Sequence, residues 1–196
     1  MRKLFVVMGK SATGKDTIYK EIIKRNSMNL VPVVMYTTRP IREGEVNGRE
    51  YNFVDEKTKQ KIEKQGKILE IRTYNTVEGP WHYFTADDEN WEDDHDHIMI
   101  GTLESYAEIR KNCSNIEIIP IYIEVEDGER LNRALIREKK EKNPNYEELC
   151  RRFIADTHDF SQDKLKSLEI DKIFMNNNLE DTIDEILNFL KDCTEK

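Results

Sequence analysis

Nine residues near the N-terminus combine glycine, lysine and hydroxyl side chains in a spacing that suits the binding of phosphate. In order, they are Gly9, Lys10, Ser11, Ala12, Thr13, Gly14, Lys15, Asp16 and Thr17. The first seven fit the pattern G-x-x-x-x-G-K, in which glycines allow sharp turns and a close approach of the backbone to an anion. Successive N–H groups at the start of the next helix would cradle the phosphates of a nucleotide, and Lys15 would reach the β- and γ-phosphates.

Asp16 occupies the position where such loops usually carry serine or threonine, whose hydroxyl binds Mg²⁺. A carboxylate is also a hard oxygen ligand, and it would hold Mg²⁺ directly or through water. Its negative charge lies beside the nucleotide phosphates, which is unfavourable unless the metal screens it. Thr17 offers a hydroxyl instead, but a shift of one residue along a helix points it in another direction. Asp16 is therefore the candidate metal ligand.

A second polar stretch carries two arginines three residues apart and a tyrosine nearby. Residues 36–53 read Y-T-T-R-P-I-R-E-G-E-V-N-G-R-E-Y-N-F. Arginine recognises phosphate through paired hydrogen bonds, and a tyrosine hydroxyl adds a further donor. Taken alone, a stretch of this kind is typical of a solvated, charged loop.

Together with the phosphate-binding pattern, the order T-T-R-x-x-R-x-G-E-x-x-G-x-x-Y-x-F resembles the signature of guanylate kinases. The resemblance implies that Arg39, Arg42 and Tyr51 hold the phosphate of an acceptor nucleotide, while Glu45 and Gly48 shape the loop. The full set of residues that it assigns to the acceptor is Thr38, Arg39, Arg42, Tyr51, Glu70, Tyr83 and Thr85.

Glu70 lies within the apolar run Ile68–Ile71, which predicts a strand. A carboxylate only accepts hydrogen bonds, and guanine presents two adjacent donors at N1 and at the 2-amino group. The resemblance gives Glu70 the role of reading these donors. An exposed glutamate on a strand is the alternative interpretation.

The segment 74–86 resembles the part of the family that carries a phosphate-binding tyrosine and a hydroxyl residue. Tyr83 and Thr85 match these two roles, with Tyr74 as a substitute for Tyr83. Phe84 stands where the family prefers glycine, and residues 78–81 look like an insertion.

Three departures from the family pattern fall on recognition of the base. Met35 stands where the family often has a serine, and Ile100 and Thr102 stand where it usually has an acidic pair. The phosphate-binding residues are retained. The resemblance therefore implies GMP as the acceptor, with a narrower preference over other nucleoside monophosphates than the family usually shows.

Arginines also gather after residue 128, in a segment that predicts two helices separated by a break at Asn143-Pro144-Asn145. Arg133 and Arg137 are four residues apart and share a helix face. The segment resembles the mobile lid of nucleoside monophosphate kinases, so Arg133, Arg137 and Arg152 would close over the transferring phosphoryl group. Ion pairs with neighbouring surface glutamates are the alternative. Asn176 resembles the asparagine that the family places near the adenine of ATP.

Short apolar strands alternate with helices along the chain, and these elements must position the polar residues. Strands are expected at residues 4–8, 30–35, 68–71, 98–105 (with its exit), 116–125 and 170–175. Helices are expected at residues 17–24, 57–67 and 129–142, from residue 146 onwards, and at residues 182–191. Such alternation implies an α/β fold with a parallel sheet flanked by helices.

The phosphate-binding stretch after the first strand makes this a P-loop NTPase core, and the resemblance adds a small NMP-binding subdomain and a helical lid. A single domain is expected over residues 1–196. Its parts are the core (1–36, 89–130 and 155–196), the NMP-binding subdomain (37–88) and the lid (131–154).

The bulk composition limits the classes of partner. A formal net charge of −8 argues against a general nucleic-acid binder. The chain has no long apolar stretch and no signal-peptide pattern, so no membrane association is expected. Cys113, Cys150 and Cys193 lack metal-binding spacing and are read as free thiols of a cytoplasmic protein. The acidic stretch Glu89–His97 is interpreted as a solvated turn rather than a metal cluster.

These features predict a monomeric or homodimeric enzyme that uses ATP and Mg²⁺ to convert GMP to GDP. One alternative is a related kinase with another phosphorylated acceptor, such as a ribose bisphosphate, which would share the Gly-Lys-Asp loop but not the motif at 37–53. The other is a non-catalytic guanylate-kinase-like module that binds phosphorylated ligands. Such modules typically lose the loop lysine, whereas Lys15 is present.

Overall fold

The apolar run Leu4–Met8 is completely buried and forms the middle of a parallel sheet in the computed structural model. The model describes residues 2–25, 28–42, 44–76, 79–87 and 94–194. In order across the sheet, the strands are β2 (Val31–Pro32), β7 (His97–Ile100), β1 (Lys3–Met8), β8 (Glu117–Glu124) and β9 (Ile173–Met175). Continuous apolar sequence without alternation is typical of a strand that is covered on both faces.

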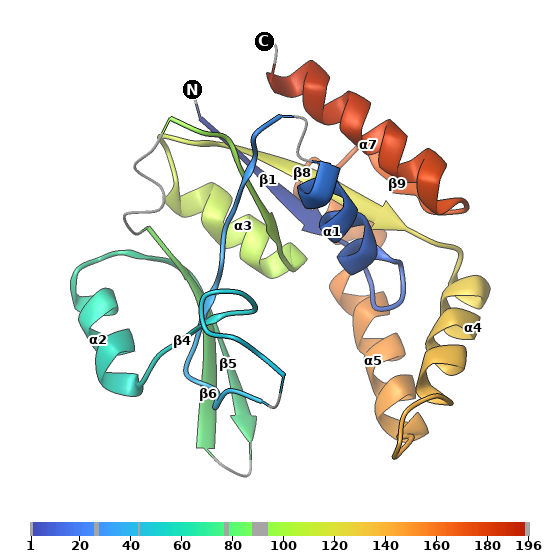
Figure 1. Ribbon diagram of the computed structural model, residues 1–196, viewed down its shortest axis with the longest axis horizontal. Coiled ribbons are helices and arrows are strands. Elements are labelled where there is room, and N and C mark those ends of the chain that lie inside the picture. The colour runs from blue at the N-terminus through green and yellow to red at the C-terminus, as the bar shows by residue number, and fades with distance from the viewer. Residues whose placement is uncertain (1, 26–27, 43, 77–78, 88–93, 195–196) are drawn as a thin grey trace.

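Helices cover both faces of this sheet (Figure 1). The helices α1 (Lys15–Arg25) and α7 (Leu179–Thr194) pack on one face, where Phe5 and Val7 of β1 meet their apolar side chains. Helices α3 (Leu103–Asn112) and α6 (Gln162–Ser167) pack on the opposite face. Because successive side chains of a strand point to opposite faces, one short strand contributes to two separate cores.

A second, four-stranded sheet extends away from the parallel sheet and lies in the lower part of Figure 1. Its strands, in order, are β4 (Asn52–Phe53), β3 (Tyr36–Thr37), β6 (Gly79–Ala86) and β5 (Ile68–Thr76). The helix α2 (Glu56–Lys64) flanks it and begins at Asp55, whose carboxylate accepts a hydrogen bond from the Thr58 N–H at 2.8 Å. Such capping by aspartate satisfies a backbone donor that the helix leaves free.

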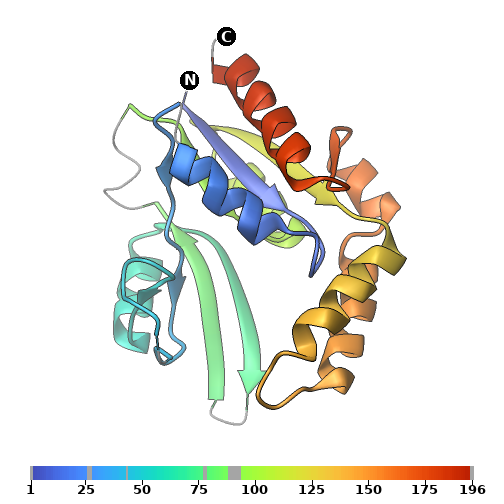
Figure 2. The same cartoon turned by 45° about the vertical axis from the view of Figure 1, so that its right-hand side comes forward.

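Two neighbouring helices, α4 (Asp127–Glu138) and α5 (Tyr146–Asp159), extend on the other side of the molecule (Figure 2). A buried arginine, Arg130 of α4, joins them. Its guanidinium lies 3.9 Å from the ring centroid of Phe153 and 3.4 Å from Asp156, both on α5. The turn between the helices is closed by the Glu138 carboxylate, which accepts from the Asn145 N–H at 2.6 Å.

The predicted α/β class, with a parallel sheet flanked by helices, is confirmed. The boundaries proposed for the subdomain and the lid stay predictions. Within the described residues, Cys113 and Cys150 are free thiols, as expected. Within the described ranges, no helix has the length and apolar character needed to cross a membrane.

Two predicted strands near the start of the second sheet have the wrong lengths. The strand expected at 30–35 pairs only at Val31–Pro32, because the chain then crosses to the second sheet, where the Met35 carbonyl accepts from Asn52. The strand expected at 68–71 continues to Thr76, since its residues pair with β6 in a hairpin that the sequence did not predict. Residues 77 and 78, and with them part of the supposed insertion, lie outside the described residues.

The stretch expected as one strand and its exit at 98–105 contains a strand end and a helix start. β7 ends at Ile100, and Thr102 caps α3, which the sequence analysis missed along with the short α6. The Thr102 side chain accepts from the Ser105 N–H, and the Ser105 side chain accepts from the Thr102 N–H, so both backbone donors are satisfied.

Helix and strand ends near the C-terminus also differ from expectation. The helix expected to reach Lys142 ends at Glu138, where tighter turns follow. The strand expected from residue 170 pairs only over Ile173–Met175. In the acidic stretch, residues 89–93 lie outside the described part, so its expected solvated turn stays a prediction.

Candidate functional site

The loop between β1 and α1 is shaped by positions that tolerate no larger residue. A Cβ on Gly9 would lie 2.5 Å from the carbonyl oxygen of Ile123, and a Cβ on Gly14 would lie 2.6 Å from the side-chain nitrogen of Asn176. Gly14 and Ala12 also have φ angles of +87° and +66°, in the left-handed region that glycine adopts freely. The two glycines therefore allow the loop to pack tightly against β8 and β9.

Hydrogen bonds hold this loop in one shape. The Thr13 hydroxyl donates to the Lys10 carbonyl at 2.9 Å, and the side-chain amide of Asn176 donates to the Thr13 carbonyl at 2.8 Å. Lys10 lies 3.4 Å from Asp127 at the start of α4. Asn176 is buried, so its side chain supports the loop; its predicted proximity to adenine stays a prediction.

One loop N–H already binds a negatively charged oxygen. The Ser11 N–H donates to the Asp156 carboxylate of α5 at 2.7 Å. A carboxylate oxygen is an acceptor of the same kind as a phosphate oxygen, so this contact shows that the loop backbone can bind an anion. Lys15 follows at the start of α1, with its amine 3.3 Å from Asp16. The Ser11 N–H therefore already makes the kind of contact that the predicted phosphate binding would need.

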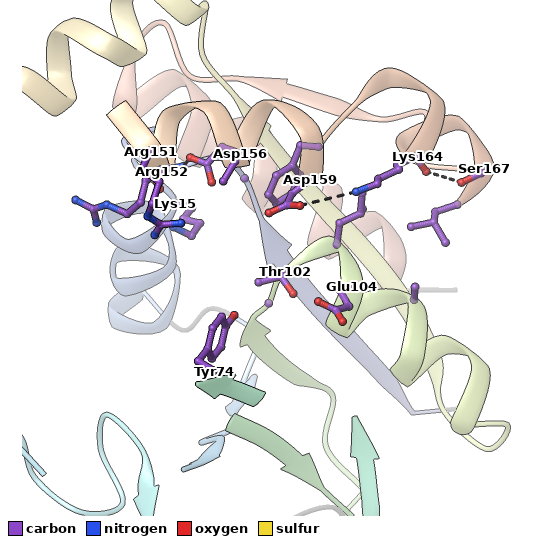
Figure 3. Close-up of a pocket in the computed structure, with 18 residues that line it drawn as sticks. Lys15, Tyr74, Thr102, Glu104, Arg151, Arg152, Asp156, Asp159, Lys164 and Ser167 are labelled. Carbon is purple, nitrogen blue, oxygen red and sulfur yellow. Dashed lines mark hydrogen bonds and ion pairs between the residues drawn. The ribbon is translucent and has the colours of Figure 1, made fainter. Parts of the chain in front are cut away.

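Loop residues Gly9, Ser11 and Lys15 line a cavity of about 610 Å³ that also reaches the start of α3, the helix α5 and the helix α6. Figure 3 shows Arg151 and Arg152 of α5 on the side of this cavity where Lys15 lies. Cationic side chains and loop N–H groups thus share one wall, which suits a polyphosphate.

The three predicted lid arginines differ in where they lie. Arg152 lines the cavity, whereas Arg133 and Arg137 are not among its lining residues. Arg133 forms an ion pair with Glu129 at 2.8 Å and donates to the Asn176 carbonyl at 3.2 Å. Arg137 is exposed and has no recorded ion pair within the part of the chain that the structure describes. The structure therefore brings only Arg152 of the three to the cavity.

Beside the four-stranded sheet, Arg39 is buried and held by several contacts. Its guanidinium donates to both carboxylate oxygens of Glu45, at 3.0 and 2.8 Å, and lies over the rings of Tyr51 and Phe53. The hydrogen bond with Glu45 raises the pKa of Arg39, and the same contact holds the pKa of Glu45 below its ordinary value. The Arg39 Nε is buried without a hydrogen-bond partner in the described ranges, which leaves a donor for a ligand.

A second cavity, of about 420 Å³, opens on the four-stranded sheet. Its lining residues are Met35, Tyr51, Arg72, Tyr74, Thr76, Trp81 and Tyr83. The rings of Tyr51 and Tyr83 meet edge to face, with centroids 5.5 Å apart, and Tyr74 meets Tyr83 in the same way at 5.6 Å. Tyr74 lines both cavities, so the two cavities adjoin at this residue.

Glu70 is buried, in contrast to the alternative of an exposed strand glutamate. Its carboxylate accepts a hydrogen bond from the Thr85 hydroxyl at 2.8 Å and another from the Arg72 Nε at 3.0 Å. Glu70 and Thr85, which the sequence analysis assigned to the acceptor, are therefore in direct contact. Arg72 stands beside them and was not predicted.

The remaining predicted positions have structural contacts of their own. The Thr38 hydroxyl accepts from the His82 N–H at 2.9 Å and so joins β6 to the chain after β3. The Arg42 side chain is exposed, while its N–H donates to Glu45 at 2.8 Å. Thr102, which stands where the family usually has an acidic residue, caps α3 and lines the larger cavity.

Several polar residues that line the two cavities were not predicted from the sequence, and Arg72, Arg151 and Asp156 are among them. Arg72 lies two residues after Glu70, and the two-residue period of a strand would have placed both on one face. Asp156 is four residues after Arg152, a spacing that puts both on one helix face. No local signal joins Asp156 to Ser11, since 145 residues separate them.

The residues available for a metal ion are few. In the described ranges, no group of three or more His, Cys, Asp or Glu side chains could hold one. Asp16 is exposed in the first turn of α1, directly after Lys15. Mg²⁺ in nucleotide sites is commonly bound by one or two carboxylates together with substrate phosphates and water, and a single exposed carboxylate beside the loop fits that arrangement.

Comparisons with known proteins agree on one family. The guanylate kinase family model matches residues 1–193. A guanylate kinase from Thermotoga maritima is 28% identical over 208 aligned positions, which cover 96% of this chain and 86% of that protein. One from Nitrobacter winogradskyi is 43% identical over 67 positions, 34% of this chain and 30% of that protein. The crystal structure of guanylate kinase from Anaplasma phagocytophilum superposes with a TM-score of 0.67 at 19% identity, covering 100% of this chain and 87% of the other.

Proposed function

The chain belongs to the guanylate kinase family of phosphotransferases, and on this premise we propose that it transfers the terminal phosphoryl group of ATP to GMP. The observation that carries the proposal is the position of Tyr74, which lines both the cavity beside the phosphate-binding loop and the cavity on the four-stranded sheet. A donor nucleotide in the first and an acceptor in the second would meet there.

The donor phosphates would lie on the loop between β1 and α1. The Ser11 N–H, which now binds the Asp156 carboxylate, would bind a phosphate oxygen instead, and Lys15 would neutralise the β- and γ-phosphates. Asp16 would hold Mg²⁺, and when bound this ion supplies further neutralisation of the phosphate charge.

The acceptor would lie along the four-stranded sheet with its phosphate towards Arg39. Arg39, Arg42, Tyr51 and Tyr83 would hold that phosphate in line with the donor, and the unpaired Arg39 Nε supports this role. At the other end of the acceptor, the buried carboxylate of Glu70 would accept hydrogen bonds from guanine. The subdomain proposed for residues 37–88 contains all of these side chains.

The chemistry needs little beyond position and charge. A phosphate oxygen of the acceptor is already a nucleophile, so no side-chain base is required, and catalysis rests on alignment and electrostatic stabilisation. Arg152 would stabilise charge on the moving group. Closure of the lid, proposed at residues 131–154, would bring Arg133 and Arg137 closer and exclude water.

An acceptor screen tests the proposal. ADP formation from ATP would be measured with GMP, dGMP, AMP, UMP and a ribose bisphosphate, and GMP is expected to give the highest kcat/KM. Equal kcat/KM for GMP and AMP would overturn the guanine assignment. A preference for the ribose bisphosphate would support the alternative kinase, and binding of GMP without any ADP formation would support a non-catalytic module.

A further inference from the structure

The hairpin of β5 and β6 presents one face to the smaller cavity. Glu70 pairs with Thr85, Arg72 with Tyr83, and Tyr74 with Trp81 across the two strands. Because strand side chains alternate, these pairs share a face, and all of them except Glu70 and Thr85 line the cavity. A register shift between Ile68 and Glu70 sets this alignment. Arg72 is therefore placed between the buried carboxylate and the aromatic residues.

Arg72 contacts two of the positions that the sequence connects with the base, Glu70 and Met35. Its Nε and Nη2 donate to the two carboxylate oxygens of Glu70, at 3.0 and 3.3 Å, and Nη2 also lies 3.5 Å from the sulfur of Met35. Met35 stands where the family often has a serine, a residue that can donate a hydrogen bond to a base. The guanidinium thus brings donors to a place where the usual hydroxyl donor is lost.

The pair of charges is largely removed from water. The Glu70 side chain is 1% exposed and the Arg72 side chain is 11% exposed. Two of the five N–H donors of arginine belong to Nη1, for which no hydrogen bond is recorded in the described part of the chain. A buried ion pair of this kind often contributes little to stability compared with apolar side chains. Its hydrogen-bond donors and acceptors therefore suit the recognition of a ligand.

Resting on the proposed function, we propose that Arg72 determines acceptor specificity by donating a hydrogen bond to O6 of guanine while Glu70 accepts from N1 and the 2-amino group. Guanine carries this acceptor directly beside its donors, so an adjacent carboxylate and guanidinium match it. Adenine presents the opposite order at the same edge, with an amino donor at position 6 and an acceptor at N1, and it would meet like groups at both contacts.

Analogues that change one atom of the base separate the two contacts. In 6-thio-GMP a sulfur, which accepts hydrogen bonds weakly, replaces O6, whereas IMP keeps O6 and N1–H but lacks the 2-amino group. The native protein is expected to prefer GMP over 6-thio-GMP about tenfold in kcat/KM, the discrimination of one good paired contact. In Arg72→Met this ratio should fall to within about twofold of unity, while the ratio of GMP to IMP stays at its native value.

The matched control changes the partner of Arg72. Glu70→Gln should reduce the ratio of GMP to IMP and leave the ratio of GMP to 6-thio-GMP at its native value. If Arg72→Met fails to fold because Glu70 is left buried and unpaired, the Glu70→Gln/Arg72→Met double variant removes both charges, and its ratio of GMP to 6-thio-GMP should also approach unity. Thermal unfolding of each variant identifies those that fold.

Two results would overturn the inference, and they differ. If native protein phosphorylates GMP but the folded Arg72 variants keep the native ratio of GMP to 6-thio-GMP, Arg72 does not read O6. A uniform loss of kcat/KM with all acceptors would then assign it to packing or to the acceptor phosphate. If the native protein phosphorylates none of these nucleotides, the proposed function fails and the inference fails with it.

Discussion

The arginines on the two sides of the molecule are held in different ways. On the acceptor side, the Arg39 side chain is 3% exposed and paired with Glu45 through two hydrogen bonds. In the proposed lid, the Arg152 side chain is 42% exposed and lies 3.8 Å from Glu148, beyond hydrogen-bonding distance, while Arg137 is exposed. Arg39 is thus fixed before any ligand binds, whereas Arg137 and Arg152 are not.

This difference has an energetic meaning. A buried guanidinium held by two hydrogen bonds has already lost its conformational entropy, so it binds a phosphate without a further ordering cost. Exposed ion pairs are worth about 0–1 kcal/mol, so Arg133 and Arg152 can exchange their glutamates for a phosphoryl group readily. Under the proposed function, Arg39 would therefore serve ground-state binding of the acceptor, and the arginines of α4 and α5 would act in the transition state.

Lys15 lies at the cavity that both regions adjoin, and its removal should have the largest effect. Lys15→Ala is expected to lower kcat a hundredfold or more, since loss of one preorganised charge at the reacting group costs about 2.7–4 kcal/mol. Steady-state ADP formation with GMP measures this, and thermal unfolding should be unchanged. The control, Lys20→Ala, removes an exposed lysine of the same helix and should keep native kcat. Turnover of Lys15→Ala within a few-fold of native would remove Lys15 from the mechanism.

Arg39→Met tests the fixed side. The variant should raise the KM for GMP by about tenfold or more, the effect of losing a charged hydrogen-bond donor. Its melting temperature should also fall, because Glu45 loses its partner. The comparison variant Arg49→Met removes an exposed arginine of the same loop and should change neither value by much. A change in kcat alone, with native KM and melting temperature, would contradict the idea of a preformed acceptor site.

Arg137→Ala tests the side that is not fixed. We expect kcat to fall by about tenfold with little change in the KM for GMP or in the melting temperature, because an exposed side chain that acts only after closure contributes to the transition state. The control is Lys139→Ala, which removes an exposed cation two residues away. An increase in KM with native kcat would place Arg137 in ground-state binding and break the division between the two regions.

The sequence predicted what depends on short, fixed spacings. The loop from Gly9 to Thr17 and the motif from Thr37 to Phe53 each lie within one continuous stretch, and the structure places Lys15 of the first and Tyr51 of the second at adjoining cavities. Apolar runs also located all five strands of the parallel sheet, with errors at their ends.

What the sequence did not predict depends on packing between distant segments. The helix α3 was not predicted, because Thr102 was interpreted as a position of base recognition and not as the N-cap of a helix. The hydrogen bond from Ser11 to Asp156 joins two segments that are 145 residues apart, so their spacing does not predict it. It depends on where α5 packs. Arg72 is different, because the two-residue period of a strand places it on the same face as Glu70, although the motifs that predicted the site do not include it.

The contact between Asp156 and Ser11 leads to the prediction with the smallest effect. The Asp156 carboxylate occupies a loop N–H that a donor phosphate would use, and its charge repels that phosphate. In Asp156→Asn the amide oxygen can still accept a hydrogen bond, but the charge is gone. We expect the KM for ATP to fall about fivefold, the equivalent of roughly 1 kcal/mol, while kcat stays near its native value.

The control for this variant is Asp159→Asn, which neutralises a second carboxylate that lines the same cavity. The Asp159 carboxylate pairs with Lys164, and it has no recorded contact with the loop in the described residues. Its KM for ATP should stay close to native, so that a fall seen only in Asp156→Asn reports the contact with Ser11 rather than the general charge of the cavity. Higher salt should reduce the difference between Asp156→Asn and native protein, because screening weakens the repulsion that the native carboxylate exerts. A rise in the KM for ATP would instead show that Asp156 positions the loop for its ligand, and the lid side would then share the preorganisation of the acceptor side.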